Sequence, residues 1–238
     1  MKNFAFIFAR KGSKRVKNKN IKKINGKPLV LYSIEIAKKI KEISKVFVST
    51  NDKRIKKIAL KNGCIVIDRP EILAKDKSAE WLAWQHAINF VREKYNKNFN
   101  FISIPPTSPL RNTADVKKCI KALDQKDDIV ITLRKTDLDP NFNMIMKKGE
   151  KIITFKNSKN IKNSKNKYNL RNNLYDIYSI TTVAYISRPN FILSHKNFFE
   201  GKVKGVVIPE SRALDIDSEF DFALAEAIIK KKLLLKDK

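Results

Sequence analysis

The stretch that decides the fold is Phe4-Ala-Phe-Ile-Phe-Ala9, which runs directly into Arg10-Lys-Gly-Ser-Lys-Arg-Val-Lys-Asn-Lys-Asn20. Six apolar residues without alternation are typical of a strand that is buried on both faces, and such strands belong to parallel sheets. Parallel sheets bind their ligands at the carboxyl ends of the strands, and this basic loop begins at such an end. The sequence therefore predicts an anion-binding turn at the edge of a parallel sheet.

The loop after this strand is suited to phosphate. Gly12 frees the backbone to turn, so that several donors can face one ligand. The loop lacks the G-x-x-x-x-G-K-[ST] pattern of P-loops and the G-x-G-x-x-G pattern of dinucleotide-binding folds. We expect nucleotide chemistry of another kind, although a lysine-rich chain also places lysines in surface loops by chance. The donors and cations of the loop are Arg10, Ser13, Lys14, Lys19 and Asn20.

Strand and helix patterns alternate up to about residue 135, as in a doubly wound α/β domain. Two returning strands and a final helix complete it, and Phe220, Leu224, Ala227 and Ile228 share one apolar face of that helix. We expect strands at 4–9, 46–50, 64–68, 101–104, 129–133, 178–186 and 203–208, and helices at 28–41, 52–62, 78–95, 113–123 and from 218 onward.

The chain has 238 residues, of which 42% are hydrophobic, and this suits one sizeable α/β domain over 1–238 with a modest insertion. We expect the insertion at about 140–176. There, Met144–Lys147 and Lys151–Phe155 predict a hairpin around Lys148-Gly-Glu150. The polar tract at 157–167 has little to bury, so it is expected to become ordered only against a ligand or another subunit.

Composition excludes several classes of protein. No apolar run approaches the ~20 residues of a membrane helix, so we expect a cytoplasmic protein. Cys64 and Cys119 lack zinc or disulfide spacing and are expected to be buried thiols, and two histidines cannot build a histidine-rich metal site. The net charge of +27 would suit a nucleic-acid-binding protein, but the lysines are spread along the whole chain. Nucleic-acid binding is therefore kept only as the non-enzymatic alternative.

Two acidic residues stand just before the final helix, in Ala213-Leu-Asp-Ile-Asp217. In an extended segment Asp215 and Asp217 share a face while Ile216 points into the core. Two carboxylates so placed can reach one Mg²⁺ ion. The alternative is that Asp217 or Ser218 only caps the helix and that Asp215 is solvated.

A proline-rich loop, Pro105-Pro-Thr-Ser-Pro-Leu-Arg111, follows the strand expected at 101–104. It would lie at the same sheet edge as the first loop and present Thr107, Ser108 and Arg111 to a ligand. A third loop, Asp68-Arg-Pro-Glu71, follows another strand. For both loops the alternative is ordinary turn chemistry, because Pro, Ser and Thr are common in turns.

Five segments occur in the order found in one known family. The chain resembles the acylneuraminate cytidylyltransferases, which make CMP-activated sialic acids and related nonulosonic acids, and it is more distantly similar to the CMP-Kdo synthetases. The resemblance covers nearly the whole length. The segments are Ala9–Lys14 with Lys19-Asn20, Val48-Ser-Thr-Asn-Asp52, Arg69-Pro-Glu71, Pro106-Thr-Ser-Pro-Leu-Arg111 and Leu214-Asp-Ile-Asp217.

The resemblance implies a Rossmann-like, doubly wound, mostly parallel sheet, with an insertion that forms a homodimer. It implies transfer of CMP from CTP to the anomeric hydroxyl of a 2-keto sugar acid, with release of pyrophosphate. Asp215 and Asp217 match the family's metal-binding pair, and Asp217 or an oxygen on the metal could take the hydroxyl proton. Arg10 and Lys19 would stabilise charge on the leaving pyrophosphate. The implied nucleotide-binding residues are Arg10, Gly12, Ser13, Lys14, Lys19 and Asn20, with Arg69 near the base.

The chain departs from the family at three places. Lys11 replaces a small or amide residue, and Pro105 replaces a glutamine associated with the sugar pocket. The segment Arg171–Thr182 replaces the Arg-Arg-Gln and Asn-Gly elements of sialic-acid enzymes. We therefore expect a legionaminic-type, pseudaminic-type or Kdo-like acceptor rather than N-acetylneuraminate; another sugar nucleotidyltransferase is the enzymatic alternative. The expected acceptor-binding residues are Thr107, Ser108, Arg111, Asn143 and Arg171.

Overall fold

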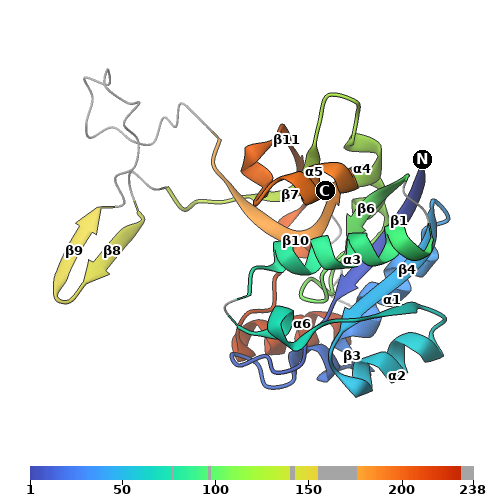
Figure 1. The fold of residues 1–238 in the computed structure, drawn as a ribbon. Coiled ribbons are helices and arrows are strands. Elements are labelled where there is room, and N and C mark those ends of the chain that lie inside the picture. The colour runs from blue at the N-terminus through green and yellow to red at the C-terminus, as the bar shows by residue number, and fades with distance from the viewer. Residues whose placement is uncertain (77, 96–97, 140–142, 155–175, 232–238) are drawn as a thin grey trace. The chain divides into compact units, whose positions relative to one another are not determined.

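The computed structural model describes residues 1–76, 78–95, 98–139, 143–154 and 176–231 (Figure 1). The chain forms two compact units. The larger unit contains Met1–Leu133 and Ile180–Lys238, and the smaller contains Arg134–Ser179. The candidate site described below is built from the larger unit.

A seven-stranded sheet forms the centre of the larger unit, in the order β11-β7-β10-β6-β1-β4-β5. The pairs β1–β4, β1–β6, β4–β5 and β7–β11 are parallel, and β10 is antiparallel to β6. The mostly parallel α/β sheet that the sequence predicts is confirmed. The strands are β1 (Lys2–Phe8), β4 (Ile43–Thr50), β5 (Ile65–Asp68), β6 (Phe99–Ser103), β7 (Ile129–Lys135), β10 (Tyr178–Ser187) and β11 (Val203–Val207).

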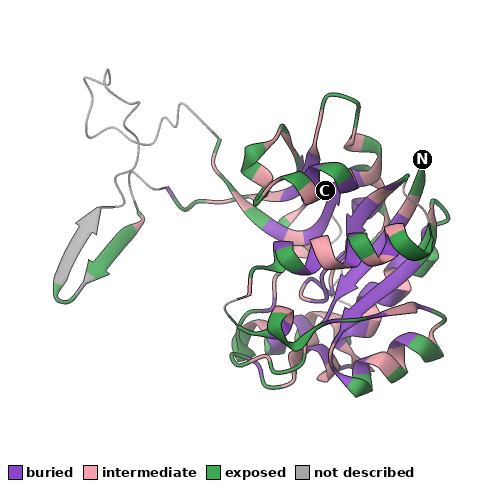
Figure 2. Cartoon of the chain, viewed as in Figure 1, coloured by how far each residue is buried: buried purple, intermediate pink, exposed green. Residues whose placement is uncertain are grey.

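Helices cover both faces of this sheet, as the doubly wound pattern requires. One face packs against α1 (Leu29–Lys39), α2 (Lys53–Lys61) and α4 (Thr113–Ala122). The other packs against α3 (Glu80–Lys94) and α5 (Pro189–Ser194). Figure 2 shows that buried residues are concentrated on the central strands between these two layers. Each predicted helix is present, and its ends differ from the prediction by at most two residues.

The strand β1 shows why its sequence lacks alternation. Phe4, Phe6 and Phe8 enter the core beneath α3 and α5, whereas Ala5 and Ile7 enter the core beneath α1, α2 and α4. The Phe6 ring stacks on the rings of Phe47 and Phe101, with centroids 5.1 and 4.7 Å away. Because both faces are covered there, every side chain from Phe4 to Phe8 is apolar. Each buried phenylalanine contributes about 1.5–3 kcal/mol.

The final helix α6 (Glu219–Lys230) packs against β2 (Lys23–Ile24) through a third apolar cluster. It buries Phe222 and Ala225. The apolar face expected from the sequence is the exposed one, because Phe220 and Leu224 are 75% and 40% exposed. The helix has apolar residues on more than one face, and its contact with β2 determines which face is buried.

The smaller unit contains the expected hairpin, in which β8 (Ile145–Lys148) and β9 (Lys151–Thr154) pair antiparallel. The turn places Gly149 at φ +63°, a conformation that glycine adopts without strain. The polar tract at 157–167 and Arg171 lie outside the described residues. The remaining short elements are β3 (Lys27–Pro28), η1 (Lys19–Ile21), η2 (Glu71–Ala74), η3 (Phe198–Glu200) and η4 (Glu210–Arg212).

Two further sequence expectations concern the described residues. None of the helices in these ranges combines the length and the apolar character that crossing a bilayer requires. Cys64 and Cys119 are buried free thiols, as predicted, and burial raises the pKa of Cys119 to about 12.

Candidate active site

Loops from distant parts of the chain meet at one edge of the sheet. Because β1, β4, β5 and β6 are parallel, the loops that follow them lie at their common carboxyl edge. The antiparallel strand β10 begins at this edge and brings Thr182 to it. Four of the five segments that carry the family resemblance lie on these loops or on the strand end just before them. The fifth, Leu214–Asp217, is joined to this edge by a hydrogen bond from the Ile216 N–H to the Thr107 carbonyl, 2.8 Å long.

The first loop turns at Gly12, whose φ of +82° favours glycine. Asn20 is buried, and its Nδ2 donates to the Arg10 carbonyl over 3.0 Å, which closes the loop on itself. The Lys11 N–H donates to Asn51 Oδ1, 2.8 Å away, and this bond fastens the loop to the end of β4. The basic loop is therefore held in place by two amide side chains.

A cavity of about 450 Å³ opens beside this loop. Arg10, Lys11 and Gly12 line it on one side, and its other lining residues are Asn51, Glu71, Ala74, Lys75 and Asp76. Across it, Asp76 accepts from Arg10 Nη2 through Oδ1 and from Lys14 Nζ through Oδ2, with both distances 2.7 Å. The two cations lower the pKa of Asp76, so this carboxylate is ionised at neutral pH. The cavity therefore combines a cationic wall with its own counter-anion.

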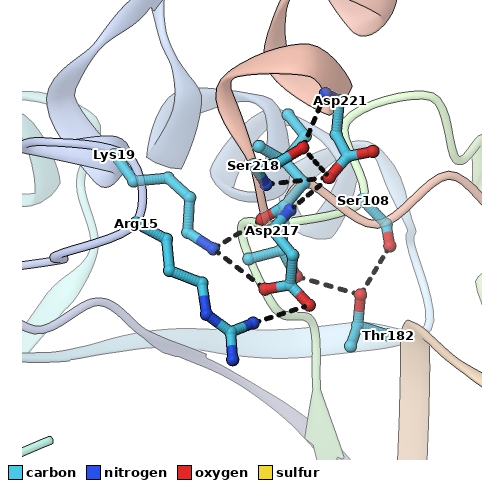
Figure 3. A network of polar contacts seen from close by, with 9 residues as sticks. Arg15, Lys19, Ser108, Thr182, Asp217, Ser218 and Asp221 are labelled. Carbon is cyan, nitrogen blue, oxygen red and sulfur yellow. Dashed lines mark hydrogen bonds and ion pairs between the residues drawn. The ribbon is translucent and has the colours of Figure 1, made fainter. Parts of the chain in front are cut away.

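The two carboxylates of Leu214–Asp217 lie in different environments. Asp217 has a side chain that is 60% exposed and lies 3.7 Å from both Lys19 Nζ and Arg15 Nη1 (Figure 3). Asp215 is half-buried, and burial raises its pKa while the Thr107 and Thr182 hydroxyls act in the opposite direction. Its Oδ1 is buried and has no hydrogen-bond partner among the described residues.

Of the two residues considered as caps of the final helix, Ser218 is the cap and Asp217 is not. Ser218 Oγ accepts from the Asp221 N–H over 3.2 Å, and Asp221 Oδ2 accepts from the Ser218 N–H over 2.8 Å, which forms a capping box at α6. Asp217 is therefore not needed as a cap. Asp215 is not fully solvated either, and Ile216 is buried as expected.

This arrangement fits a divalent metal ion that the protein would share with a ligand. An unpartnered carboxylate oxygen beside a second, exposed carboxylate is a donor set that suits Mg²⁺. Within the described ranges there is no group of three or more His, Cys, Asp or Glu side chains that could hold a metal. Asp215 and Asp217 are the residues that could hold such an ion.

Three hydroxyl groups stand beside these carboxylates. Thr182 Oγ1 lies 2.9 Å from Thr107 Oγ1 and 2.7 Å from Ser108 Oγ. Figure 3 shows Thr182 and Ser108 pointing toward each other. The loop after β6 and the start of β10 are thus joined where Asp215 lies.

The predicted site residue Arg111 lies beneath this hydroxyl cluster and is 4% exposed. Its guanidinium donates to Ser33 Oγ over 2.7 Å, to the Thr182 carbonyl over 3.2 Å and to the Pro105 carbonyl. Burial lowers its pKa to about 9, which leaves it charged at neutral pH. Its contacts hold the loop to α1 and β10, and a direct contact with an acceptor stays a prediction.

Arg69 is also buried. Its Nε donates to Ser49 Oγ and its Nη2 to the Ser49 carbonyl, each over 3.2 Å, and its guanidinium lies 5.4 Å from the centre of the Phe8 ring. Burial lowers its pKa to about 10. Arg69 thus joins the ends of β1, β4 and β5, and contact with a base stays a prediction.

The residues predicted from the sequence and those that meet in the structure are not all the same. The structure brings Lys19 to Asp217 and to the Ile216 carbonyl, whereas Arg10 and Lys14 pair with Asp76. Asn143 belongs to the smaller unit. Asn51, Asp76 and Thr182 were not predicted individually as site residues. Asn51 could have been found, because it directly follows a predicted strand. Asp76 could not, because an acidic residue in a loop carries no signal for a phosphate site.

Comparison with known proteins identifies the family of this chain. The sequence profile of the family described as cytidylyltransferase matches residues 4–237. The chain belongs to the cytidylyltransferase family. It is therefore a nucleotidyltransferase, as the resemblance implied, and the basic loop and carboxylate pair lie within the matched region.

Relatives match this cytidylyltransferase along most of its length. It is 34% identical over 232 residues to the post-translational flagellin modification protein B of Campylobacter coli, covering 96% of this chain and 95% of that one. It is 32% identical, with the same coverage, to the CMP-N,N'-diacetyllegionaminic acid synthase of Campylobacter jejuni. It is 29% identical to an Escherichia coli N-acylneuraminate cytidylyltransferase, covering 97% of this chain and 53% of that longer protein.

A solved structure supports the fold. The CMP-2-keto-3-deoxy-manno-octonic acid synthetase in complex with CTP superposes with a TM-score of 0.71 at 12% identity, covering 98% of this chain and 100% of that one. Identity this low establishes the shared fold alone.

Proposed function

We propose that this cytidylyltransferase transfers CMP from CTP to a 2-keto sugar acid of the nonulosonic class and releases pyrophosphate. The observation that carries the proposal is the approach of the basic first loop to the carboxylate pair: Lys19 Nζ lies 3.7 Å from Asp217 Oδ1 and donates to the Ile216 carbonyl over 2.5 Å. A site for a metal-bound triphosphate needs cations and carboxylates side by side. The acceptor class comes from the names of two relatives, the N-acylneuraminate cytidylyltransferase and the CMP-N,N'-diacetyllegionaminic acid synthase.

The first loop would bind the triphosphate. Arg10, Lys14 and Lys19 would neutralise its oxygens, and Gly12, Ser13 and Asn20 would shape the turn and add donors. Because Arg10 and Lys19 are held by contacts to other segments, they are in position before charge develops on the leaving pyrophosphate. Arg69 would support the nucleotide end of the site from beneath.

Asp215 and Asp217 would hold Mg²⁺. When bound, the ion neutralises phosphate charge and aligns the group that is transferred. The protein's own contribution is to keep one carboxylate buried beside hydroxyl groups and the other exposed beside Lys19 and Arg15. We also propose Asp217 as the group that takes the proton of the attacking hydroxyl.

The acceptor would bind beside the hydroxyl cluster of Thr107, Ser108 and Thr182. We propose contributions from Arg111, Asn143 and Arg171, and a homodimer formed through the insertion at about 140–176. Light scattering tests the dimer, and a monomer mass at working concentration would contradict it. We place the reaction in the cytoplasm, where nucleoside triphosphates are available.

Pyrophosphate release tests the nucleotide half of the proposal. The enzyme is assayed with Mg²⁺, one sugar acid at a time, and CTP, UTP, ATP or GTP. We expect release with CTP, and loss of release after chelation or in Asp217→Asn. Glu42→Gln is the matched control, because it removes one negative charge at the amino end of β4, the opposite edge of the sheet. Equal release with ATP or GTP would contradict a cytidylyltransferase function.

A further inference from the structure

The proposed triphosphate site contains an acidic residue that opposes its ligand. Asp76 forms two ion pairs, with Arg10 Nη2 and with Lys14 Nζ, each 2.7 Å long. Arg10 is held further because its Nη1 donates to the Ala74 carbonyl over 3.3 Å. Asp76 therefore occupies the position in which an anionic ligand of these cations would be expected.

Electrostatics require that the two anions compete. A triphosphate that binds Arg10 and Lys14 brings several negative charges to within a few ångströms of the Asp76 carboxylate. The Asp76 side chain is 34% exposed and lies in a loop, and Lys14 is 81% exposed, so both can move apart at small cost. Each ion pair made to the ligand replaces one made to Asp76.

Glu71 lines the same cavity but has a different role. Its carboxylate oxygens accept from Asn51 Nδ2 over 3.0 and 3.1 Å, and Asn51 in turn fixes Lys11. Glu71 therefore supports the loop without contacting its cations in the described ion pairs. Two acids in one cavity can thus be compared, and only Asp76 is paired with the cations.

We propose that Asp76 is an internal counter-anion of the first loop, which holds Arg10 and Lys14 while the site is empty and is exchanged for phosphate when the ligand binds. Asp76 would therefore set the affinity of the site: it keeps the cations ordered, and it weakens binding because its ion pairs must break. This inference rests on the proposed function in one respect, namely that the first loop is the triphosphate site.

The test measures binding of inorganic tripolyphosphate by isothermal titration calorimetry at low salt without metal. Asp76→Asn preserves shape and removes the charge, so we expect binding about threefold to tenfold tighter than in the wild type, the range expected when two exposed ion pairs no longer compete. The gain should shrink at high salt because screening weakens exposed pairs. Glu42→Gln controls for net charge and should leave binding unchanged.

Comparison of the two cavity acids distinguishes the exchange from a general effect of charge. Tightening in Asp76→Asn that exceeds the effect of Glu71→Gln supports the exchange. An equal gain in both variants would overturn it, because the effect would then reflect the general field of the cavity. Unchanged or weaker binding in Asp76→Asn would also overturn it. Since the probe contains no cytidine or sugar, failure to form a CMP-sugar would refute the proposed function and leave this result standing.

Discussion

Replacing Arg111 with methionine tests whether this buried arginine is structural. Methionine keeps the apolar stem of the side chain but removes the donors to Ser33 Oγ and to the Pro105 and Thr182 carbonyls. The buried Pro105 carbonyl and the partly buried Thr182 carbonyl each lose a charged donor, at about 1–3 kcal/mol each. Part of this loss is offset because no guanidinium has to be desolvated. We expect a net loss of about 3 kcal/mol in the free energy of unfolding.

Thermal unfolding measures this loss. For a chain of this size, about 3 kcal/mol corresponds to a fall in Tm of roughly 6–12 °C. Arg15→Met is the control, because the Arg15 side chain is 79% exposed and its loss should leave Tm nearly unchanged. If Arg111→Met kept the wild-type Tm but raised KM for the sugar acid, the structural reasoning would be refuted and direct contact with the acceptor supported.

Three other substitutions test separate parts of the structure. A hydrogen bond from Arg54 lowers the pKa of Asp52 in the folded protein. The ionised Asp52 therefore stabilises the fold above its unfolded pKa of about 3.9, and this stabilisation is lost as the pH falls through the lower folded pKa. Asp52→Asn should have a lower Tm than the wild type at pH 7, and the difference should shrink as the pH falls below about 4. Thr182→Val should weaken the binding of Mn²⁺ in the presence of CTP, measured by EPR, by about tenfold, because the hydroxyl beside Asp215 is lost. Unchanged Mn²⁺ affinity would contradict a role of this hydroxyl in supporting Asp215. Gly12→Ala should cost about 1–2 kcal/mol through its φ of +82° alone, since nothing lies within 4 Å of the added Cβ; a wild-type Tm would show that the loop relaxes freely.

The order of strands and helices was predictable because local patterns determine it. The uninterrupted apolar residues of β1 indicated burial on both faces, and both faces of that strand are covered. Position after a parallel strand then indicated which loops would gather at one edge. The loops at Arg10–Asn20, Asp68–Glu71 and Pro105–Arg111 do gather there, because all three follow parallel strands.

Side-chain roles were less predictable because they depend on contacts between distant segments. Arg111 carries the same sequence signal whether it faces a ligand or, as here, protein carbonyls. The pairing of Asp76 with Arg10 joins residues 66 positions apart. On α6, Phe220 and Leu224 match a buried pattern as well as Phe222 does, and only the contact with β2 decides between them. Tertiary packing therefore determines which of these side chains are buried and which residues they contact.

Direct detection of the product tests the central claim. Enzyme, Mg²⁺ and CTP are incubated with N,N'-diacetyllegionaminic acid, pseudaminic acid, N-acetylneuraminate or Kdo in turn, and the CMP-sugar is followed by mass spectrometry and ³¹P NMR. We predict a CMP ester at the anomeric oxygen of a nonulosonic acid, with N-acetylneuraminate not the acceptor of highest kcat/KM. Highest kcat/KM for N-acetylneuraminate would contradict the acceptor assignment, and absence of a CMP ester with every acid would contradict the proposed function itself.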